Sequence, residues 1–150
     1  MKISNAPSSV RPFRILLIDD NQNGLMARRT LLEEIGYETC TASSPEDGLA
    51  QFAASPFDLV ITDYKMPKMN GAQVIASIRE KNPAIPIVLI SGMVDALGLN
   101  ETNTGADVVI AKSATEVTHM TRAVNRLLKR SIPKKPAGSQ LATRYRAKSV

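Results

Sequence analysis

Short apolar runs recur along most of this chain, and polar or amphipathic stretches separate them. Five such segments are predicted to be β-strands: residues 14–18, 37–42, 57–63, 86–90 and 107–111. Most are apolar at successive positions rather than at alternate ones, which is typical of strands covered on both faces. The segment 37–42 has mixed polarity, so we expect it at an edge of the sheet.

Apolar residues at helical spacing follow each of these runs. They predict helices over residues 22–35, 45–54, 72–81, 93–105 and 115–130. Gly36 is a stop signal, and Ser44 before Pro45 is a start signal. The segment 93–105 contains Gly98 and several polar residues, so we expect a weak, mobile helix there. Arg28 falls on the apolar face of the first helix, and the pattern does not explain it.

Five strands that alternate with five helices predict a three-layer α/β domain built on a parallel sheet. The length of 150 residues fits one domain with extensions. We place the domain at residues 13–130, between a flexible leader over 1–12 and a basic, disordered tail over 131–150.

The net charge of +5 is concentrated at the end of the chain. From Lys129 onward there are seven basic residues and no acidic ones, whereas residues 1–128 hold 12 basic and 14 acidic residues. The tail is interpreted as a solvated extension; contact with nucleic-acid phosphates is the alternative. The lone Cys40 excludes an internal disulfide. Signal-peptide and membrane-spanning runs are absent from the sequence, which favours a cytoplasmic protein without a membrane partner.

Polar side chains follow the central apolar runs at the point where each run ends. Asp19 and Asp20 follow the first run, Asp63 ends the third, Ser91 follows the fourth and Lys112 follows the fifth. Ligands of open parallel sheets bind beyond the carboxyl ends of the strands. We therefore expect these five side chains to lie at one rim.

Each of these residues also has a simpler interpretation as a helix cap, a loop hydroxyl or a surface charge. Their combination is harder to explain in that way. Two carboxylates 4 Å apart repel by about 4 kcal/mol at an effective dielectric constant near 20. One Mg²⁺ and the Lys112 ammonium would balance three carboxylates, and Mg²⁺ prefers hard oxygen ligands.

A carboxylate in such a site can act as a nucleophile toward a phosphoryl group. Asp63 is the candidate nucleophile, Lys112 and the metal would stabilise charge on the transferring oxygens, and Ser91 would donate a hydrogen bond. The sequence therefore predicts phosphoryl transfer onto the protein itself.

In their order along the chain, four motifs resemble the receiver domain of two-component response regulators. They are IDD at 18–20, TDYKMPKMNG at 62–71, ISG at 90–92 and AKS at 111–113. The resemblance implies a flavodoxin-like fold with strand order 2-1-3-4-5. It also implies that Asp63 accepts a phosphoryl group from a histidine kinase or histidine phosphotransfer protein.

The same resemblance implies a set of Mg²⁺ ligands. Asp20 and Asp63 would bind the ion directly, the backbone carbonyl of Lys65 would complete the protein ligands, and Asp19 would act mostly through water. It also implies that the Ser91 hydroxyl and the side chain at position 109 form the switch that reports phosphorylation.

Three departures from the family pattern involve four positions. Ser113 follows Lys112, where the family usually has a proline joined by a cis peptide bond, so we expect a trans peptide or a strained loop. Val109 replaces the aromatic residue of the switch, which weakens the usual coupling. Lys65 and Met93 occupy positions that tune the lifetime of the phosphoryl group in the family.

The leading hypothesis is a single-domain receiver like those of chemotaxis. Fewer than ~25 residues follow the last helix, and an output domain needs ~50 or more. The segment 93–105, the last strand and the last helix would report phosphorylation to an unknown downstream protein. The alternative is an interaction scaffold that works without phosphorylation. A phosphatase with an aspartate nucleophile would need a second Asp at position 65, which is Lys65 here.

Overall fold

Five parallel strands form one sheet in the order β2-β1-β3-β4-β5, which confirms the expected flavodoxin-like topology. The computed structural model describes residues 11–130, so most of the predicted leader and all of the predicted tail lie outside the described residues. The strands are β1 (Arg14–Ile18), β2 (Glu38–Ala42), β3 (Leu59–Thr62), β4 (Ile87–Ser91) and β5 (Val108–Ala111). The mixed-polarity strand β2 lies at an edge, as its sequence predicts.

Six helices accompany the sheet within residues 11–130. They are α1 (Gln22–Glu34), α2 (Pro45–Ala54), α3 (Gly71–Lys81), α4 (Val94–Leu97), α5 (Glu101–Thr104) and α6 (Glu116–Arg130). The prediction of five helices was wrong in one segment, because 93–105 is broken into two four-residue helices. Gly98 adopts a left-handed conformation with φ of 61°, and Asn100 then caps a new helix by accepting the Asn103 N–H.

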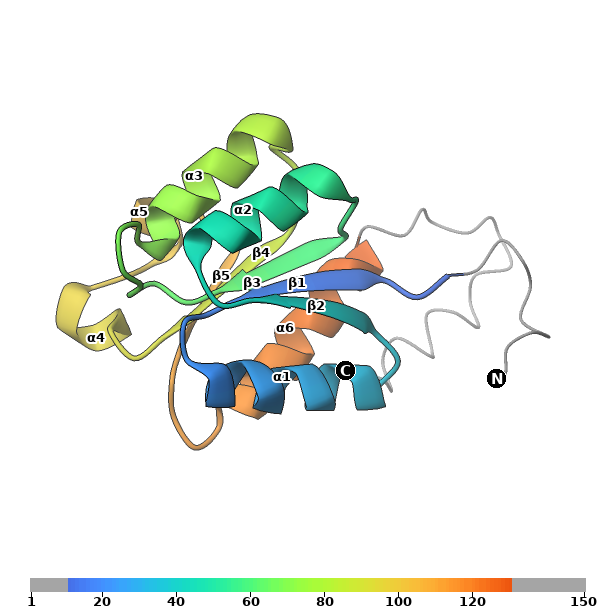
Figure 1. Cartoon of the computed structure of the whole chain (residues 1–150). Coiled ribbons are helices and arrows are strands. Elements are labelled where there is room, and N and C mark those ends of the chain that lie inside the picture. The colour runs from blue at the N-terminus through green and yellow to red at the C-terminus, as the bar shows by residue number, and fades with distance from the viewer. Residues whose placement is uncertain (1–10, 131–150) are drawn as a thin grey trace.

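The sheet lies between two helical layers (Figure 1). Helices α1 and α6 cover one face, and α2 and α3 cover the other. Alternate residues of β1 point into opposite cores: Ile15 and Leu17 belong to the first, and Leu16 and Ile18 belong to the second. Full burial of each such side chain contributes about 1.5–3 kcal/mol. This two-sided burial is the reason that the central strands are apolar at successive positions.

Helix caps hold the loops that follow β1 and β3. Asn21 begins α1 by accepting the Gly24 N–H, and Asn70 begins α3 in a capping box with Gln73. These caps place both helix starts close to the carboxyl edge of the sheet, where the predicted site residues lie. Within residues 11–130, no helix is long and apolar enough to cross a membrane.

Gly71, the first residue of α3, packs directly against the backbone that follows β3. A methyl group at this position would overlap the carbonyl oxygen of Asp63 and lie 2.9 Å from the Tyr64 Cα atom. Because backbone atoms cannot move aside as a flexible side chain can, a larger residue here must displace the loop that carries Asp63.

We expect Gly71→Ala to lower the free energy of unfolding by about 2 kcal/mol, the usual size of an overpacking effect. Urea denaturation followed by circular dichroism measures this change. Gly92→Ala is the matched control, because a methyl group at Gly92 meets nothing within 4 Å. A Gly71→Ala protein as stable as Gly92→Ala would show that the loop yields without cost.

Candidate functional site

Three aspartates meet at the carboxyl edge of the two central strands. Asp19 and Asp20 follow β1, and Asp63 follows β3. The two strands are hydrogen-bonded neighbours in a register that pairs Ile18 with Thr62, so the residues after them come together. Carboxylate oxygens of all three aspartates lie within 4.8 Å of one another. The sequence prediction that these groups converge is thereby confirmed.

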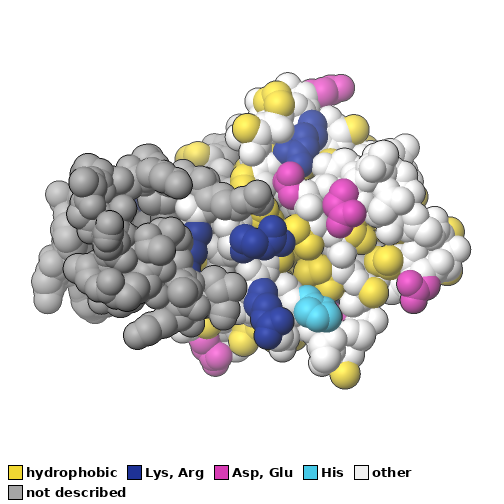
Figure 2. Space-filling view, turned by 180° about the vertical axis from the view of Figure 1, so that it is seen from behind, with side chains coloured by type: hydrophobic (Ala, Val, Ile, Leu, Met, Phe, Trp, Pro, Cys, Tyr) yellow, Lys and Arg dark blue, Asp and Glu magenta, His cyan; other side chains and the backbone are white. Residues whose placement is uncertain are grey.

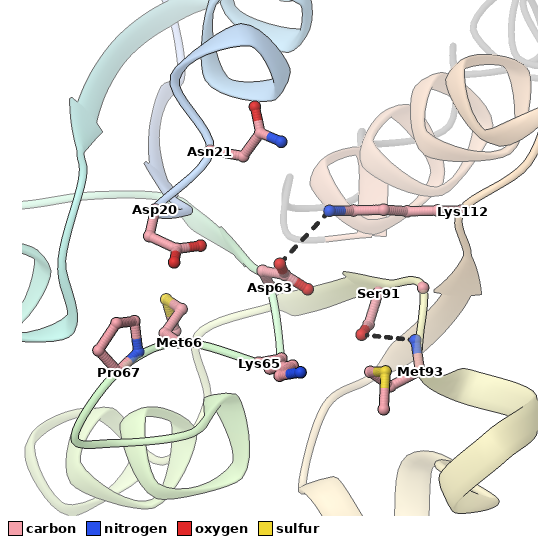
Figure 3. A pocket seen from close by; sticks show the side chains of 10 residues that line it. Asp20, Asn21, Asp63, Lys65, Met66, Pro67, Ser91, Met93 and Lys112 are labelled. Carbon is pink, nitrogen blue, oxygen red and sulfur yellow. Dashed lines mark hydrogen bonds and ion pairs between the residues drawn. The ribbon is translucent and has the colours of Figure 1, made fainter.

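The three carboxylates differ in their exposure to solvent. Asp19 is 1% exposed and Asp63 is 7% exposed, whereas Asp20 is open to water. Asp63 Oδ1 accepts the backbone N–H of Tyr64 at 2.6 Å, and its Oδ2 faces Lys112. Asp63 is therefore held in one orientation, with its second oxygen turned toward the cleft (Figure 3).

Lys112 reaches the acidic residues from the end of β5. Its backbone N–H donates to the carbonyl of Ser91 at 3.0 Å, which continues the pairing of β4 and β5 by one residue. Its Nζ atom lies 3.3 Å from Asp63 Oδ2 and 3.6 Å from Asp19 Oδ2. One ammonium group thus contacts two of the three carboxylates.

Crowding and burial raise the pKa of Asp63 above its ordinary value of 3.8. Desolvation is the largest cause, and the nearby Asp19 carboxylate adds to it. The Lys112 ammonium and the Tyr64 N–H act in the opposite direction without cancelling the shift. The charged form of Asp63 is therefore disfavoured in this environment.

Ser91 is the last residue of β4, whereas the sequence predicts that Ser91 follows the strand. Its side chain is fully buried, and its Oγ accepts the Met93 N–H at 3.0 Å (Figure 3). This contact fixes the hydroxyl at the wall of the cleft. Because the oxygen acts there as an acceptor, its O–H remains able to donate.

A cleft of about 520 Å³ opens over these groups. Its lining includes Asp20, Asp63, Lys65, Ser91, Met93 and Lys112. Asp19 lies beneath this lining, because it is almost completely covered by protein. The structure thus brings together all five residues predicted from the strand ends, and it adds Lys65 and Met93 at the mouth.

Sequence reasoning missed two charged residues beside the site, Arg28 and Glu116. Arg28 Nη1 donates to Asp19 Oδ2 at 2.9 Å, and its Nη2 donates to Glu116 Oε2 at 3.2 Å. The only signal in the sequence was an arginine on the apolar face of a helix. Glu116, in the first turn of α6, gives no such signal, and its carboxylate contacts Arg28.

Two of the departures from the family pattern, at Ser113 and Val109, can also be located. The peptide bond before Ser113 is trans, as expected, since residues 11–130 contain no cis peptide bond. Val109 is half-buried on β5, and its backbone N–H donates to the Glu101 carboxylate of α5 at 3.2 Å. No aromatic ring occupies the position of the usual switch residue.

The donor set of the cleft fits Mg²⁺. It consists of carboxylate oxygens, which are hard ligands, and the three carboxylates outnumber the two cations that contact them, Lys112 and Arg28. Asp20 is exposed and can reach an ion with little desolvation, while Asp19 is covered and occupied by Arg28. The geometry thus separates an open carboxylate from a covered one.

Comparison with known proteins agrees with this geometry. The family described as "Response regulator receiver domain" matches residues 15–125. A response regulator receiver domain protein from Clostridium thermocellum aligns with a TM-score of 0.70 and 33% identity, covering 79% of this chain and 95% of that one. The response regulator TrrA from Thermotoga maritima, in complex with Mg²⁺–BeF, aligns with a TM-score of 0.69 and 32% identity. That alignment covers 77% of this chain and 98% of the other.

Curated relatives include a probable transcriptional regulator, ycf27, from Cyanidium caldarium. It is 34% identical over 97 residues, which are 65% of this chain and 38% of the relative. The chain thus spans less than half the length of this relative.

The raised pKa of Asp63 predicts how stability responds to its removal. The native protein holds the Asp63 proton more tightly than the unfolded chain does, so the charged form costs stability above the native pKa. We expect Asp63→Asn to raise the free energy of unfolding by about 1 kcal/mol at pH 7 without divalent metal. The gain should shrink as the pH falls through the native pKa, and vanish below 3.8.

Urea denaturation in chelating buffer at several pH values measures this effect. Asp95→Asn removes one carboxylate from an exposed position on α4 and should change stability by less than about 0.5 kcal/mol. An Asp63→Asn protein that is less stable than wild type at pH 7 would mean that the contact with Lys112 outweighs the repulsion.

Proposed function

Since this chain belongs to the family of response regulator receiver domains, we propose that Asp63 accepts a phosphoryl group from a phosphohistidine donor. The donor would be a histidine kinase or a histidine phosphotransfer protein. The observation that carries the proposal is the position of Asp63 Oδ2, 3.3 Å from Lys112 Nζ and beside two further carboxylates at the rim of the cleft. Residues 13–130 are the receiver domain in this proposal.

The chemistry follows from the groups that surround Asp63. A carboxylate oxygen of Asp63 attacks phosphorus, the bond from phosphorus to the donor imidazole breaks, and the imidazole nitrogen keeps the electron pair. The Lys112 ammonium neutralises charge on the phosphoryl oxygens, and the Ser91 O–H donates to one of them. The Tyr64 N–H holds the other carboxylate oxygen, so Asp63 needs no reorientation before the attack.

Asp20, Asp63 and the backbone carbonyl of Lys65 would hold Mg²⁺, with Asp19 acting mostly through water. When bound, the ion supplies Lewis-acid stabilisation of charge on the phosphoryl oxygens. Water later attacks phosphorus, the bond from phosphorus to the Asp63 oxygen breaks, and inorganic phosphate leaves as the carboxylate is restored. The protein thus promotes only its own phosphorylation and dephosphorylation, and its output is a signal.

The surface formed by α4, α5, β5 and α6 is the proposed reporting face. It contains a groove between β5 and α6 that is lined by Val109, Ala123 and the basic side chains of Arg122 and Arg126. On this side of the molecule, exposed hydrophobic atoms are bordered by basic side chains and by His119, the single histidine (Figure 2). A downstream protein would bind here. The basic tail lies outside the described residues, and contact with nucleic acid remains its alternative role.

One observation favours a second candidate, an interaction scaffold that needs no phosphorylation. Val109 has no ring to turn toward Ser91, and its N–H is already engaged by Glu101. On this alternative, the β5–α6 groove binds its partner with equal affinity in both states.

Phosphoryl transfer is tested with a small phosphodonor, such as acetyl phosphate, and Mg²⁺. We expect the intact mass of the wild-type protein to rise by one phosphoryl group, and the mass of Asp63→Asn to stay unchanged. Asp95→Asn removes an exposed carboxylate outside the cleft and should be phosphorylated like wild type. An unmodified wild-type protein under these conditions would favour the scaffold.

The reporting face is tested with beryllofluoride and Mg²⁺, which mimic the phosphorylated state. We expect the amide NMR signals of residues 91–112 to shift in the wild-type protein, because this segment contains Ser91, the two short helices and β5. Asp63→Asn should show no such change. Shifts confined to the cleft residues, which include 91–93 and 112, with unchanged signals over 94–111 would contradict this reporting face.

A further inference from the structure

Arg28 forms a buried ionic bridge between the acidic cleft and helix α6. It is 5% exposed, and its guanidinium binds Asp19 at the end of β1 through Nη1 and Glu116 through Nη2. Glu116 lies in the first turn of α6, 88 residues further along the chain than Arg28. One side chain of α1 therefore joins a residue of the cleft to the start of the last helix.

A buried ionic bridge of this kind contributes little to protein stability. Burial costs the ions their hydration free energy, and the attraction between them seldom exceeds that cost. Apolar residues of similar volume often stabilise the fold equally well. Arg28 Nε is also the one buried side-chain nitrogen or oxygen in residues 11–130 that has no hydrogen-bond partner. The guanidinium is thus oriented so that Nη1 and Nη2 each bind a carboxylate, while Nε has no hydrogen-bond partner.

Helix α1 also adapts to the bridge. Gly24 lies one turn before Arg28, inside the helix, where glycine is less favourable than alanine. A methyl group at Gly24 would come within 3.3 Å of Arg28 Nη1 and 3.5 Å of Asp19 Oδ2. A larger residue at this position would therefore crowd the ion pair and displace Arg28 by a few tenths of an ångström.

Asp19 connects the bridge to the cleft. Its Oδ1 accepts the Asn21 N–H at 2.9 Å, and its Oδ2 is shared between Arg28 and Lys112. Additional positive charge near Asp19 competes with Arg28 for this carboxylate and repels the guanidinium. Glu116 is the other carboxylate available to Arg28, so the bridge has two ends that a cation in the cleft would affect in opposite directions.

We propose that Arg28 is a positioning residue that couples cation occupancy of the acidic cleft to the first turn of α6. Positive charge in the cleft weakens the contact of Arg28 with Asp19 and strengthens its contact with Glu116. The inference rests on the proposed function only for the Mg²⁺ site, and phosphoryl transfer is not required for it. Because α6 also carries His119, Arg122 and Arg126, this coupling reaches the helix that lines the β5–α6 groove.

Coupling between two sites is reciprocal, so removal of the Glu116 charge must change the affinity for Mg²⁺. Glu116→Gln leaves Arg28 with Asp19 alone, and Asp19 then contributes less negative charge to the cleft. We expect at least a fivefold weaker Mg²⁺ affinity, the lower end of typical coupling between sites. Titration calorimetry of the full chain at constant ionic strength measures this affinity.

The variant Arg28→Lys distinguishes an effect of the two-ended bridge from an effect of the positive charge alone. Lysine keeps the positive charge near Asp19, but its single ammonium lacks the planar fork that holds two carboxylates. In the Arg28→Lys background we expect Glu116→Gln to change Mg²⁺ affinity by less than twofold. Glu80→Gln removes an equal charge from an exposed position on α3, across the sheet, and should also change it by less than twofold.

Amide NMR during the Mg²⁺ titration gives a second readout. We expect the signals of residues 116–120 to shift in the wild-type protein and to shift less in Arg28→Lys, which should keep its circular dichroism spectrum. An equal loss of affinity from Glu116→Gln in both backgrounds would overturn the proposal, because a bridge through Arg28 requires unequal losses. No loss in the wild-type background, or no Mg²⁺ binding by the wild-type protein, would also overturn it.

These results are independent of the test of phosphoryl transfer. A protein that shows the Arg28-dependent coupling but takes no phosphoryl group onto Asp63 supports this inference and contradicts the proposed function. A protein that is phosphorylated on Asp63 but shows equal losses in both backgrounds contradicts this inference alone.

Discussion

Repulsion among carboxylates at the end of the sheet is the constraint on which the site depends. Asp19 and Asp63 are almost completely buried and lie side by side, and the pKa of Asp63 is raised as a result. The protein offsets this charge from two sides, with Lys112 at the end of β5 and Arg28 on α1. Together with Asp20 and Glu116, the cluster still carries two more negative than positive charges. The remaining excess of negative charge is what makes the cleft attractive to a divalent cation.

The strand order makes this crowding unavoidable. β1 lies between β2 and β3, and parallel pairing sends all carboxyl ends to one edge, so residues that follow β1 and β3 must meet. The two apolar cores hold the central strands on both faces and leave them no freedom to separate the charges. Packing energy from the sheet thus maintains an electrostatic arrangement that the acidic residues alone would not adopt.

The sequence predicted the strands and the site residues beyond them, because both depend on local patterns. Asp63 directly follows a buried run, and Lys112 directly follows another, so their positions could be found without knowing any contact. Three features could not be found in this way. Glu116 pairs with Arg28 across 88 residues, and no local pattern records such a contact. The break of 93–105 into two helices depends on the backbone of Gly98, which composition only suggests. The burial of Asp19 under Arg28 depends on the tertiary position of α1.

Val109 and Arg28 both affect how a change in the cleft reaches helix α6. A ring that turns in a pocket can report a change in the cleft through its volume, and Val109 has too few atoms to do so. An ionic contact reports through charge instead, and it needs no empty space to move into. Arg28 contacts α6 from helix α1 through its ion pair with Glu116, whereas β5 lines the β5–α6 groove together with the same helix. Both routes therefore end at α6, and a loss of the steric route at Val109 still leaves this helix electrostatically connected to the cleft.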